Sequence, residues 1–433
     1  MSQTEQLLHR LSTEPSDQRI IIIGAGIVGS ALGYYLSGQS QEEIIVLDRS
    51  LHPLRGSTEH APGYVGQLND NQILTFLAKE SVEAYRQIPG GFDNCGCLEV
   101  AWDEPSLEAL HLRHTTAKSQ GIDAVTLTRD EAVGLAKVLI KDTECTGALY
   151  FPGDGTADAR RVTSYFRQQA ELNGVVFAEA EVQGLIIQDS RVTGIQTGQY
   201  VIPCSSAVLA AGIWTSALLG RSKINCKMPI FPVEHPYIHS RRHVDRPSTK
   251  IPFVRIPSRH IYLRDHGDHF GIGSYAHRPR AVDTEALCST AIWNWPSPTF
   301  DECLSEALKH VPENTTSSFF PYKTAADALP RVDATEALAF NGLFSVTPDN
   351  LPMLGPVSTL PNLYVAAAVW VTHAAGCAKA LANMMATDGQ AGAKVPKELK
   401  ALDPARFDGI DDDALKEEAM RRYSDIYFSG AAD

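Results

Sequence analysis

Residues 19–29 read RIIIIGAGIVG, and this stretch decides the fold. Residues 19–23 are a β-branched run without a polar break after the arginine, which is typical of a buried strand. An apolar helical pattern follows over residues 30–36, and a second apolar run over residues 43–48 ends in an acid. Strand, glycine turn, helix and strand in this order predict a βαβ unit with two parallel strands.

The turn carries a complete Gly-x-Gly-x-x-Gly motif, formed by Gly24, Gly26 and Gly29. Such glycines allow a tight turn, a close approach of the backbone to a pyrophosphate and close packing of helix on strand. The helix N-terminus adds unpaired N–H groups and a positive dipole end. Asp48, at the end of the second strand, is placed to accept hydrogen bonds from ribose hydroxyls. Together these features predict a dinucleotide site.

The motif by itself does not separate NAD from FAD. It occurs once, close to the N-terminus, and no second βαβ unit follows for another dinucleotide. This arrangement favours a bound flavin beside a substrate domain over a pair of dinucleotide domains.

Parallel βαβ patterns return at residues 150–215 and 340–385, with strand-rich blocks between them. This alternation predicts an α/β fold with an α+β cap: a Rossmann-like FAD-binding domain built from separated segments, plus a mostly antiparallel β-sheet substrate domain. The predicted boundaries are 18–95, 150–225 and 325–390 for the cofactor domain, 96–149 and 226–324 for the substrate domain, and 391–433 for a C-terminal tail that wraps the surface.

Charge and composition exclude several classes of protein. The net charge of −13 argues against nucleic acid and anionic membranes as partners. No run of eighteen or more apolar residues is long enough to span a bilayer, and residues 1–19 lack the pattern of a secretory or transit signal. We therefore expect a cytoplasmic location. The eight cysteines are scattered, which predicts buried thiols and not a disulfide framework.

Several longer strings resemble the flavin domain of the dimethylglycine oxidase family and the related dimethylglycine and sarcosine dehydrogenases, within the glycine and sarcosine oxidase superfamily. The matching strings are IIIIGAGIVGSALGYYL, GSTEHAPGYVGQLN, IYLRDHGDHFGIGSYAHRP, FNGLFSVTPDNLPMLGP, NLYVAAAVWVTHAAGCAKALANMM and, in the tail, DPARFDG and YSDIY. The related proteins continue into a folate-binding domain, and this chain stops before it. The resemblance thus implies a flavoprotein without a folate domain, which releases the one-carbon unit as formaldehyde.

The resemblance implies that His60, in the string GSTEHAPGY, is bonded covalently to the flavin 8α-methyl group. The residues also make physical sense there, because the loop follows the ribose-binding strand and can lie over the isoalloxazine ring. The turn pairs Gly56-Ser57 and Pro62-Gly63 fix the imidazole. The alternative is a structural loop histidine.

The resemblance also carries over two substrate-site residues, His235 in EHPY and Tyr262 in IYLRDHG. An imidazole and a phenol facing a flavin can orient an amine and keep its nitrogen lone pair unprotonated, as loss of a hydride requires. Two neighbours depart from the family pattern, Pro236 and Leu263, and leave the shape of the cavity open. The alternative is a pair of sheet residues with satisfied hydrogen bonds.

Residues 369–373 lie just before a helix start, where N–H groups can stabilise an anionic reduced flavin. The resemblance adds residues 349–356 and the backbone near Val182 as cofactor contacts. The predicted cofactor-binding residues are Gly24, Gly26, Ile27, Val28, Gly29, Asp48, Arg49, Gly56, Ser57, Thr58, His60, Ala61, Gly63, Val182, Ala211, Gly212, Trp214, Val369, Trp370, Val371, Thr372 and His373.

The short turn at residues 265–269 could alternatively be interpreted as a metal site formed by Asp265, His266, Asp268 and His269. Alternate side chains there are expected on opposite faces, and no cysteine or second histidine pair completes a ligand set, so no metal is predicted. The chain also lacks a Gly-x-Ser-x-Gly hydrolase elbow.

These patterns predict an FAD-dependent oxidase of a secondary or tertiary, N-methyl amine, with O2 as acceptor and a possible homo-oligomer. A substrate carboxylate would call for a cation, and Arg255 and Arg264 lie in the right region. If neither points inward, a bulkier amine is the alternative. Three other hypotheses stay open: a dehydrogenase with another electron acceptor, a flavin-binding protein without catalysis, and a nicotinamide dehydrogenase.

Overall fold

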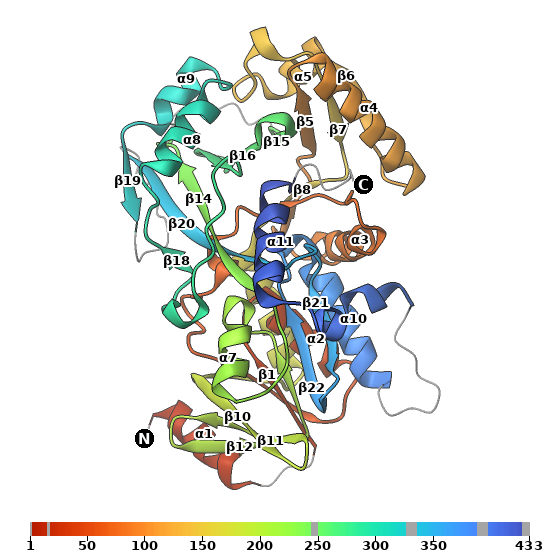
Figure 1. Ribbon diagram of the computed structural model, residues 1–433, viewed down its shortest axis with the longest axis vertical. Coiled ribbons are helices and arrows are strands. Elements are labelled where there is room, and N and C mark those ends of the chain that lie inside the picture. Colours follow the sequence, from red (N-terminus) through yellow and green to blue (C-terminus); the bar gives the residue numbers. More distant parts are fainter. Residues whose placement is uncertain (1, 15–17, 244–249, 326–335, 388–396, 427–433) are drawn as a thin grey trace.

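The computed structural model describes residues 2–14, 18–243, 250–325, 336–387 and 397–426. Two large sheets dominate it, one in each half of the molecule (Figure 1). The N-terminus lies at the far end of the first half, and the C-terminal helix crosses between the halves (Figure 1). The predicted mixed α/β fold is confirmed.

The first sheet is parallel except at one edge, and it has six strands in the order β21-β22-β13-β1-β2-β9. Its centre is the strand that the sequence predicts, paired in parallel with β2 and β13. The strands are β1 (Arg19–Ile23), β2 (Glu43–Asp48), β9 (Val176–Glu179), β13 (Ser206–Leu209), β21 (Met353–Val357) and β22 (Leu360–Ala367).

Successive side chains of β1 serve two cores, because a strand points alternate residues to opposite faces. Ile20 and Ile22 pack into the layer of helices, and Ile21 and Ile23 pack against a small three-stranded sheet. The layer of helices consists of α2 (Ile27–Ser37), α3 (Gln72–Arg86), α6 (Ala159–Leu172) and α10 (Ala374–Thr387). The other layer consists of α1 (Gln3–Thr13), β10 (Val182–Gln188), β11 (Arg191–Thr197), β12 (Tyr200–Pro203) and α7 (Thr215–Arg221).

The second sheet is mostly antiparallel and follows the order β18-β20-β14-β17-β16-β15-β5-β7-β6, with β19 beside β20. Its strands are β5 (Cys97–Ala101), β6 (Val125–Thr128), β7 (Gly147–Phe151), β14 (Phe231–His239), β15 (Phe253–Ile256), β16 (Ile261–Asp265), β17 (Phe270–Ser274), β18 (Ile292–Trp293), β19 (Tyr322–Ala325) and β20 (Ala337–Val346).

One face of the second sheet is apolar and is covered by helices, whereas the other carries aromatic and titratable side chains. Val254, Leu263 and Ile272 belong to the covered face, whose core also holds residues of α5 and α8. The helices of this half are α4 (Glu104–Ser119), α5 (Arg129–Ala136), α8 (Thr299–Leu308) and α9 (Glu313–Thr316). A small separate sheet, which joins the halves, consists of β3 (Tyr64–Val65), β4 (Phe92–Asp93) and β8 (Gly155–Ala157).

Two segments lie elsewhere than the sequence predicts. Strand β20 falls in the 325–390 segment assigned to the cofactor domain, but it pairs with β14 along the whole of that strand. The expectation that the tail only wraps the surface is wrong, because α11 (Asp412–Ser424) buries Tyr423 completely between the two halves. Both misplacements have one cause: pairing partners distant in sequence decide where an element lies.

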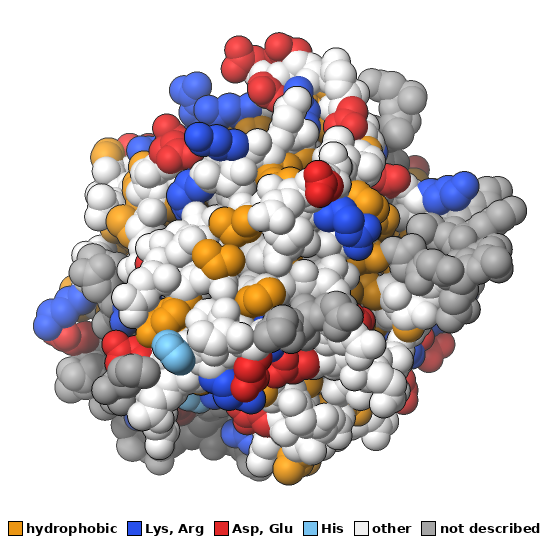
Figure 2. Space-filling model, turned by 90° about the horizontal axis from the view of Figure 1, so that it is seen from below, with side chains coloured by type: hydrophobic (Ala, Val, Ile, Leu, Met, Phe, Trp, Pro, Cys, Tyr) orange, Lys and Arg blue, Asp and Glu red, His pale blue; other side chains and the backbone are white. Residues whose placement is uncertain are grey.

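The described residues contain no helix long and apolar enough to cross a bilayer. The face seen from below mixes lysine and arginine with aspartate and glutamate, and hydrophobic side chains are scattered over it (Figure 2). On that face, positive and negative side chains are interspersed.

Candidate functional site

A cavity of about 1180 Å³ lies between the two sheets. Of the individually named cofactor residues, all but Gly29 line it, and so do His235 and Tyr262. Of the predicted stretch 349–356, only residues 349–351 line it. The first sheet and its loops contribute the glycine turn and residues 369–373. The second sheet contributes most of an aromatic wall, which Tyr64 of β3 and Tyr275, just after β17, complete. The aromatic wall consists of Tyr64, Phe253, Tyr262, Tyr275, Phe340 and Phe344.

The glycine turn at one end of the cavity has no room for side chains. Gly24 has φ +112°, and a Cβ there would lie 2.3 Å from the Ala210 carbonyl oxygen. A Cβ on Gly29 would lie 1.8 Å from the Gly24 carbonyl oxygen, so Gly29 holds α2 against the turn without lining the cavity. The motif therefore brings bare backbone and the N-terminus of α2 to the cavity wall.

The end of β2 is fixed to this turn by Asp48. Its Oδ2 accepts a hydrogen bond from the Ala25 N–H at 2.7 Å, and burial raises the pKa of the carboxyl group. Farther along the wall, the Arg49 guanidinium lies 4.8 Å from the centre of the Trp214 ring. Val182, Ala211 and Gly212 complete this end, which has the shape and polarity for a nucleoside.

The loop that carries His60 is a 3-10 turn, Ser57–His60, and two contacts fix it. The Ser57 hydroxyl donates to the Leu343 carbonyl at 2.9 Å, and the Arg264 guanidinium donates to the Pro62 carbonyl. Both ring nitrogens of His60 are buried without a hydrogen-bond partner among the described residues. Burial lowers the pKa of His60 to about 4, so the imidazole is neutral at pH 7 and has a lone pair available.

Residues 369–373 form the opposite wall and lead into α10. Two side chains of the segment hold it in place by hydrogen bonds to neighbouring backbone. The Trp370 Nε1–H donates to the Ser345 carbonyl at 2.9 Å, and the Thr372 hydroxyl donates to the Tyr64 carbonyl at 3.1 Å. Burial lowers the pKa of His373 to about 3. Because His373 is neutral, its side chain adds no charge at the start of α10, and the partial positive charge of the helix N-terminus is left as it is.

His235 and Tyr262 lie on β14 and β16, the two strands that flank β17. Tyr237, two residues along β14 from His235, and Tyr262 both pair with Gly273. A Cβ on Gly273 would lie 2.2 Å from the Tyr262 ring, so this glycine makes space for the phenol to cross toward β14. The Tyr262 hydroxyl lies 2.6 Å from His235 Nε2, and the two rings are nearly parallel.

His235 is also the middle of a longer chain of hydrogen bonds. Its Nδ1 lies 2.7 Å from the Tyr423 hydroxyl, which lies 3.1 Å from His277 Nε2, and His277 Nδ1 faces the Arg278 carbonyl at 3.2 Å. A carbonyl can only accept, so His277 Nδ1 carries its proton toward Arg278, and the Tyr423 hydroxyl donates its proton to the Glu234 carbonyl at 3.0 Å. Tyr423 then accepts from His235 Nδ1–H, and His235 Nε2 accepts from Tyr262.

The pKa of His235 falls to about 3, chiefly through burial and secondarily through His277. A neutral imidazole in this tautomer has its acceptor nitrogen toward Tyr262 and the cavity. The sequence identified His235 and Tyr262 but missed Tyr423 and His277, although both lie in strings noted above, YSDIY and GSYAHRP. Nothing in these two strings indicated which of their side chains would point toward His235.

Four charged side chains at one part of the cavity wall are paired: Asp70, Glu99, Arg113 and Arg255. Glu99 is almost completely buried and accepts from Arg255 at 2.7 Å, and its other oxygen lies 2.6 Å from Arg113. Arg113 also lies 3.4 Å from Asp70. Arg255 thus lines the cavity as the sequence allowed, but Arg264 points to the His60 loop instead. An acid inside the apolar strand CLEVA is the signal that would have found Glu99.

The two departures from the family pattern do not shape the cavity. Pro236 and Leu263 alternate with His235 and Tyr262 along their strands, so they lie on the opposite face of the sheet. Neither lines the cavity, and Leu263 belongs to the core under the helices.

A histidine group lies on the same sheet outside this cavity. The expectation that the turn after β16 points its side chains to opposite faces is wrong for His266 and His269, whose rings stack 4.6 Å apart at 3°. His239, from β14, joins them, which no spacing within the turn could reveal.

Comparison with known protein families matches residues 19–384 to the FAD dependent oxidoreductase (DAO) family. The chain belongs to this family. The chain is 27% identical over 411 residues to 4-methylaminobutanoate oxidase (formaldehyde-forming) of Paenarthrobacter nicotinovorans, covering 91% of this chain and 46% of that protein. It is 23% identical over 400 residues to mitochondrial dimethylglycine dehydrogenase of Homo sapiens, covering 89% and 44%. The chain thus spans less than half the length of these relatives.

Solved structures of other proteins share the fold. L-Proline dehydrogenase from P. horikoshii superposes with a TM-score of 0.74 at 22% identity, over 91% of this chain and 98% of that one. Glycine oxidase from Bacillus cereus ATCC 14579 superposes with a TM-score of 0.67 at 19% identity, over 85% and 94%. FAD, the cofactor of the family, fits the residues present: a side-chain-free turn, a buried acid at the end of β2 and an unpartnered imidazole line one continuous cavity.

Proposed function

We propose that this protein uses FAD to oxidise a secondary or tertiary amine, in particular an N-methyl amine. The observation that carries the proposal is the neutral His235–Tyr262 pair on the wall that faces the His60 loop and residues 369–373 across one cavity. FAD, when bound, supplies a two-electron acceptor for the hydride that leaves the N-methyl carbon. Water then converts the resulting iminium ion into formaldehyde and the demethylated amine.

The proposed task of the protein is to hold the amine neutral and oriented. His235 cannot protonate an amine at pH 7, because its own pKa is about 3. Tyr262 donates to His235, so its oxygen lone pairs face the cavity as acceptors for an amine N–H or for a water molecule. The aromatic wall excludes water around the methyl group, which favours the uncharged amine that can lose a hydride.

The charge pattern leaves two kinds of substrate open. Arg255 and Arg113 share Glu99, and Asp70 adds a second acid, so the four charges cancel. A substrate carboxylate would have to compete with Glu99 for a guanidinium, whereas a bulky aromatic amine would need only the apolar wall. The names of the relatives, 4-methylaminobutanoate oxidase and dimethylglycine dehydrogenase, support the carboxylated kind.

A panel of amines tests the proposal. Anaerobic mixing of the yellow holoprotein with an N-methyl amine should bleach the flavin absorbance, and formaldehyde should appear in equal amount after a turnover. The panel contains three carboxylated amines, sarcosine, dimethylglycine and 4-methylaminobutanoate, and one amine without a carboxylate, N-methylbenzylamine. The amine that bleaches the flavin faster shows whether the substrate is carboxylated or bulky and aromatic. Bleaching by NADH alone, or by none of the amines, would contradict the proposal.

The electron acceptor is tested with the same substrate in air. We propose O2 as the acceptor, and stoichiometric peroxide without any added dye is the expected result. Turnover that needs an artificial acceptor, with the flavin still reduced by the amine, would instead identify a dehydrogenase.

We also propose that FAD is attached covalently through His60. The buried, neutral and unpartnered imidazole is the support for this bond. Acid precipitation of the wild-type protein should leave the flavin in the pellet, and a His60→Ala variant should release any flavin it holds into the supernatant. His52→Ala is the matched control, since His52 is an exposed loop histidine just upstream. A colourless wild-type pellet would reject the covalent bond and leave the amine reaction untouched.

A further inference from the structure

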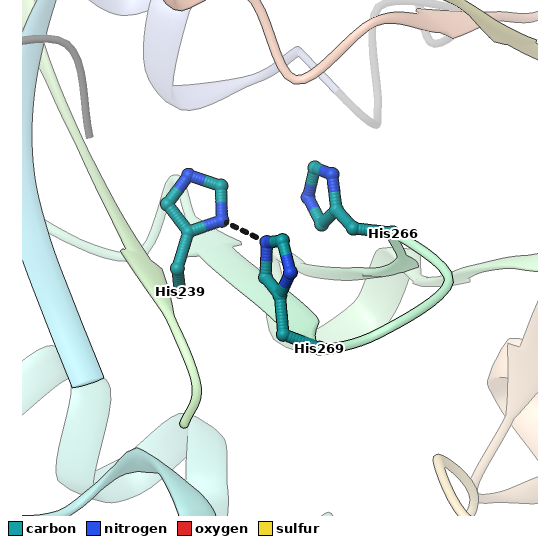
Figure 3. A group of neighbouring side chains, drawn as sticks. All are labelled: His239, His266 and His269. Carbon is teal, nitrogen blue, oxygen red and sulfur yellow. Dashed lines mark hydrogen bonds between the residues drawn. The ribbon is translucent and has the colours of Figure 1, made fainter. Parts of the chain in front are cut away.

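Three histidines converge at the end of β14 (Figure 3). None of them lines the cofactor cavity. His239 is the last residue of β14, and His266 and His269 lie in the turn that connects β16 with β17. One ring nitrogen from each lies within 4.8 Å of the others. Neighbouring strands place them, because His239 pairs with Gly271 in the register of the sheet.

The protonation states of the group suit a ligand set. Asp268 Oδ1 lies 2.6 Å from His269 Nδ1, and a carboxylate accepts, so this nitrogen carries the proton. His269 Nε2 is then a bare acceptor, 2.9 Å from His239 Nδ1.

We propose that His239, His266 and His269 form a binding site for Zn²⁺ or a similar borderline divalent cation. Imidazole nitrogen is a preferred ligand of such ions, and three protein ligands leave a fourth, tetrahedral position for water. Binding moves the proton of His239 from Nδ1 to Nε2 and draws the three nitrogens inward to about 2.0–2.1 Å from the ion. No proton is lost from the group.

Asp268 completes the arrangement behind the ligands. A carboxylate that accepts from the distal N–H of a ligating histidine fixes the ring and raises its basicity. Asp268 also pairs with Arg242 at 3.2 Å. The positive charge of Arg264, on the same hairpin, opposes a dication, and Asp268 offsets part of that repulsion.

The position of the site gives it a consequence for the catalytic wall. His239 shares β14 with His235, and His266 directly follows β16, the strand of Tyr262. His266 Nε2 also lies 3.1 Å from the Tyr237 hydroxyl, and Tyr237 lines the cavity. A bound ion would clamp the hairpin turn to β14 and so hold the strands of His235 and Tyr262 together.

Calorimetric titration tests the site directly. Tag-free holoprotein, first dialysed against a chelator, should bind one zinc ion per chain, and its melting temperature should rise with zinc. Asp268→Asn should weaken binding about 10–100-fold, because it removes the partner of His269 but no ligand. A double variant, His266→Asn with His269→Asn, should abolish it.

Exposed histidines distant from the group supply the controls, His9→Asn and His111→Asn, which should bind zinc as the wild type does. Wild-type protein that binds no stoichiometric zinc would overturn the proposal, as would unchanged binding in the double variant. If the double variant does not fold and lacks yellow FAD, the titrations of the wild type and of the Asp268→Asn variant, whose substitution is at an exposed residue, still determine whether the histidines bind zinc.

Discussion

Replacing His235 with asparagine is expected to lower the rate constant of anaerobic flavin reduction by about 10²-fold, the size of effect expected when a substrate is misplaced by about 1 Å. The imidazole lies 2.6 Å from the Tyr262 hydroxyl and 2.7 Å from the Tyr423 hydroxyl, so its loss breaks the chain at the centre. Asparagine keeps a polar side chain but cannot reach both phenols. Stopped-flow absorbance with the best amine of the panel is the measurement.

Tyr423→Phe serves as the graded comparison. Tyr423 touches His235 but is not among the residues that line the cavity, so we assign it as a positioning residue. Of the hydrogen bonds that this variant removes, the one to His235 acts on the reaction, and its loss, about 1.4 kcal/mol, predicts about a tenfold slower reduction. The substrate concentration for half-maximal rate and the FAD content should stay unchanged. Wild-type reduction rates in His235→Asn would contradict the proposed role of the pair.

The second large effect is expected at Gly29. Gly29→Ala should weaken FAD binding by roughly five- to 150-fold, which corresponds to the 1–3 kcal/mol typical of overpacking. The added Cβ would meet the Gly24 carbonyl oxygen at 1.8 Å, and that atom is backbone and cannot rotate away. Flavin content after purification and the melting temperature are the measurements.

Gly33→Ala, one turn farther along α2, is the matched control. Its Cβ would lie 3.5 Å from the nearest atom, in ordinary contact with Val46. Alanine is also about 0.8–1 kcal/mol better than glycine within a helix, so this variant should keep FAD and melt no lower than the wild type. Equal flavin content in the two alanine variants would reject the steric explanation of Gly29.

Local patterns sufficed where neighbours in sequence are neighbours in space. The βαβ unit is one such case, since residues 19–48 contain both strands, the turn and the helix. The His60 loop is also close in sequence to Asp48, and His60 lines the same cavity. His235 and Tyr262 were predicted from the family resemblance, and both line the cavity, whereas Pro236 and Leu263, which were expected to affect its shape, do not.

Contacts between distant segments could not be read in this way. Tyr423 reaches His235 across 188 positions, from a tail whose polar composition predicts a surface segment. His239 joins the histidines of the turn across thirty positions, and Glu99 holds Arg255 across 156. In each case the periodicity of apolar and polar residues predicts which face of a helix or strand is buried, but it does not predict which other segment packs against that face.

By itself, the sequence determined the dinucleotide turn, because short-range sterics specify it, and the resemblance of longer strings indicated the flavin family and predicted His235 and Tyr262 as substrate-site residues. Only the tertiary structure decided which charges at the cavity cancel, which tautomer His235 adopts, and that three histidines meet beside β14. These properties depend on distances between atoms of different elements, and the packing of the two sheets and α11 fixes those distances.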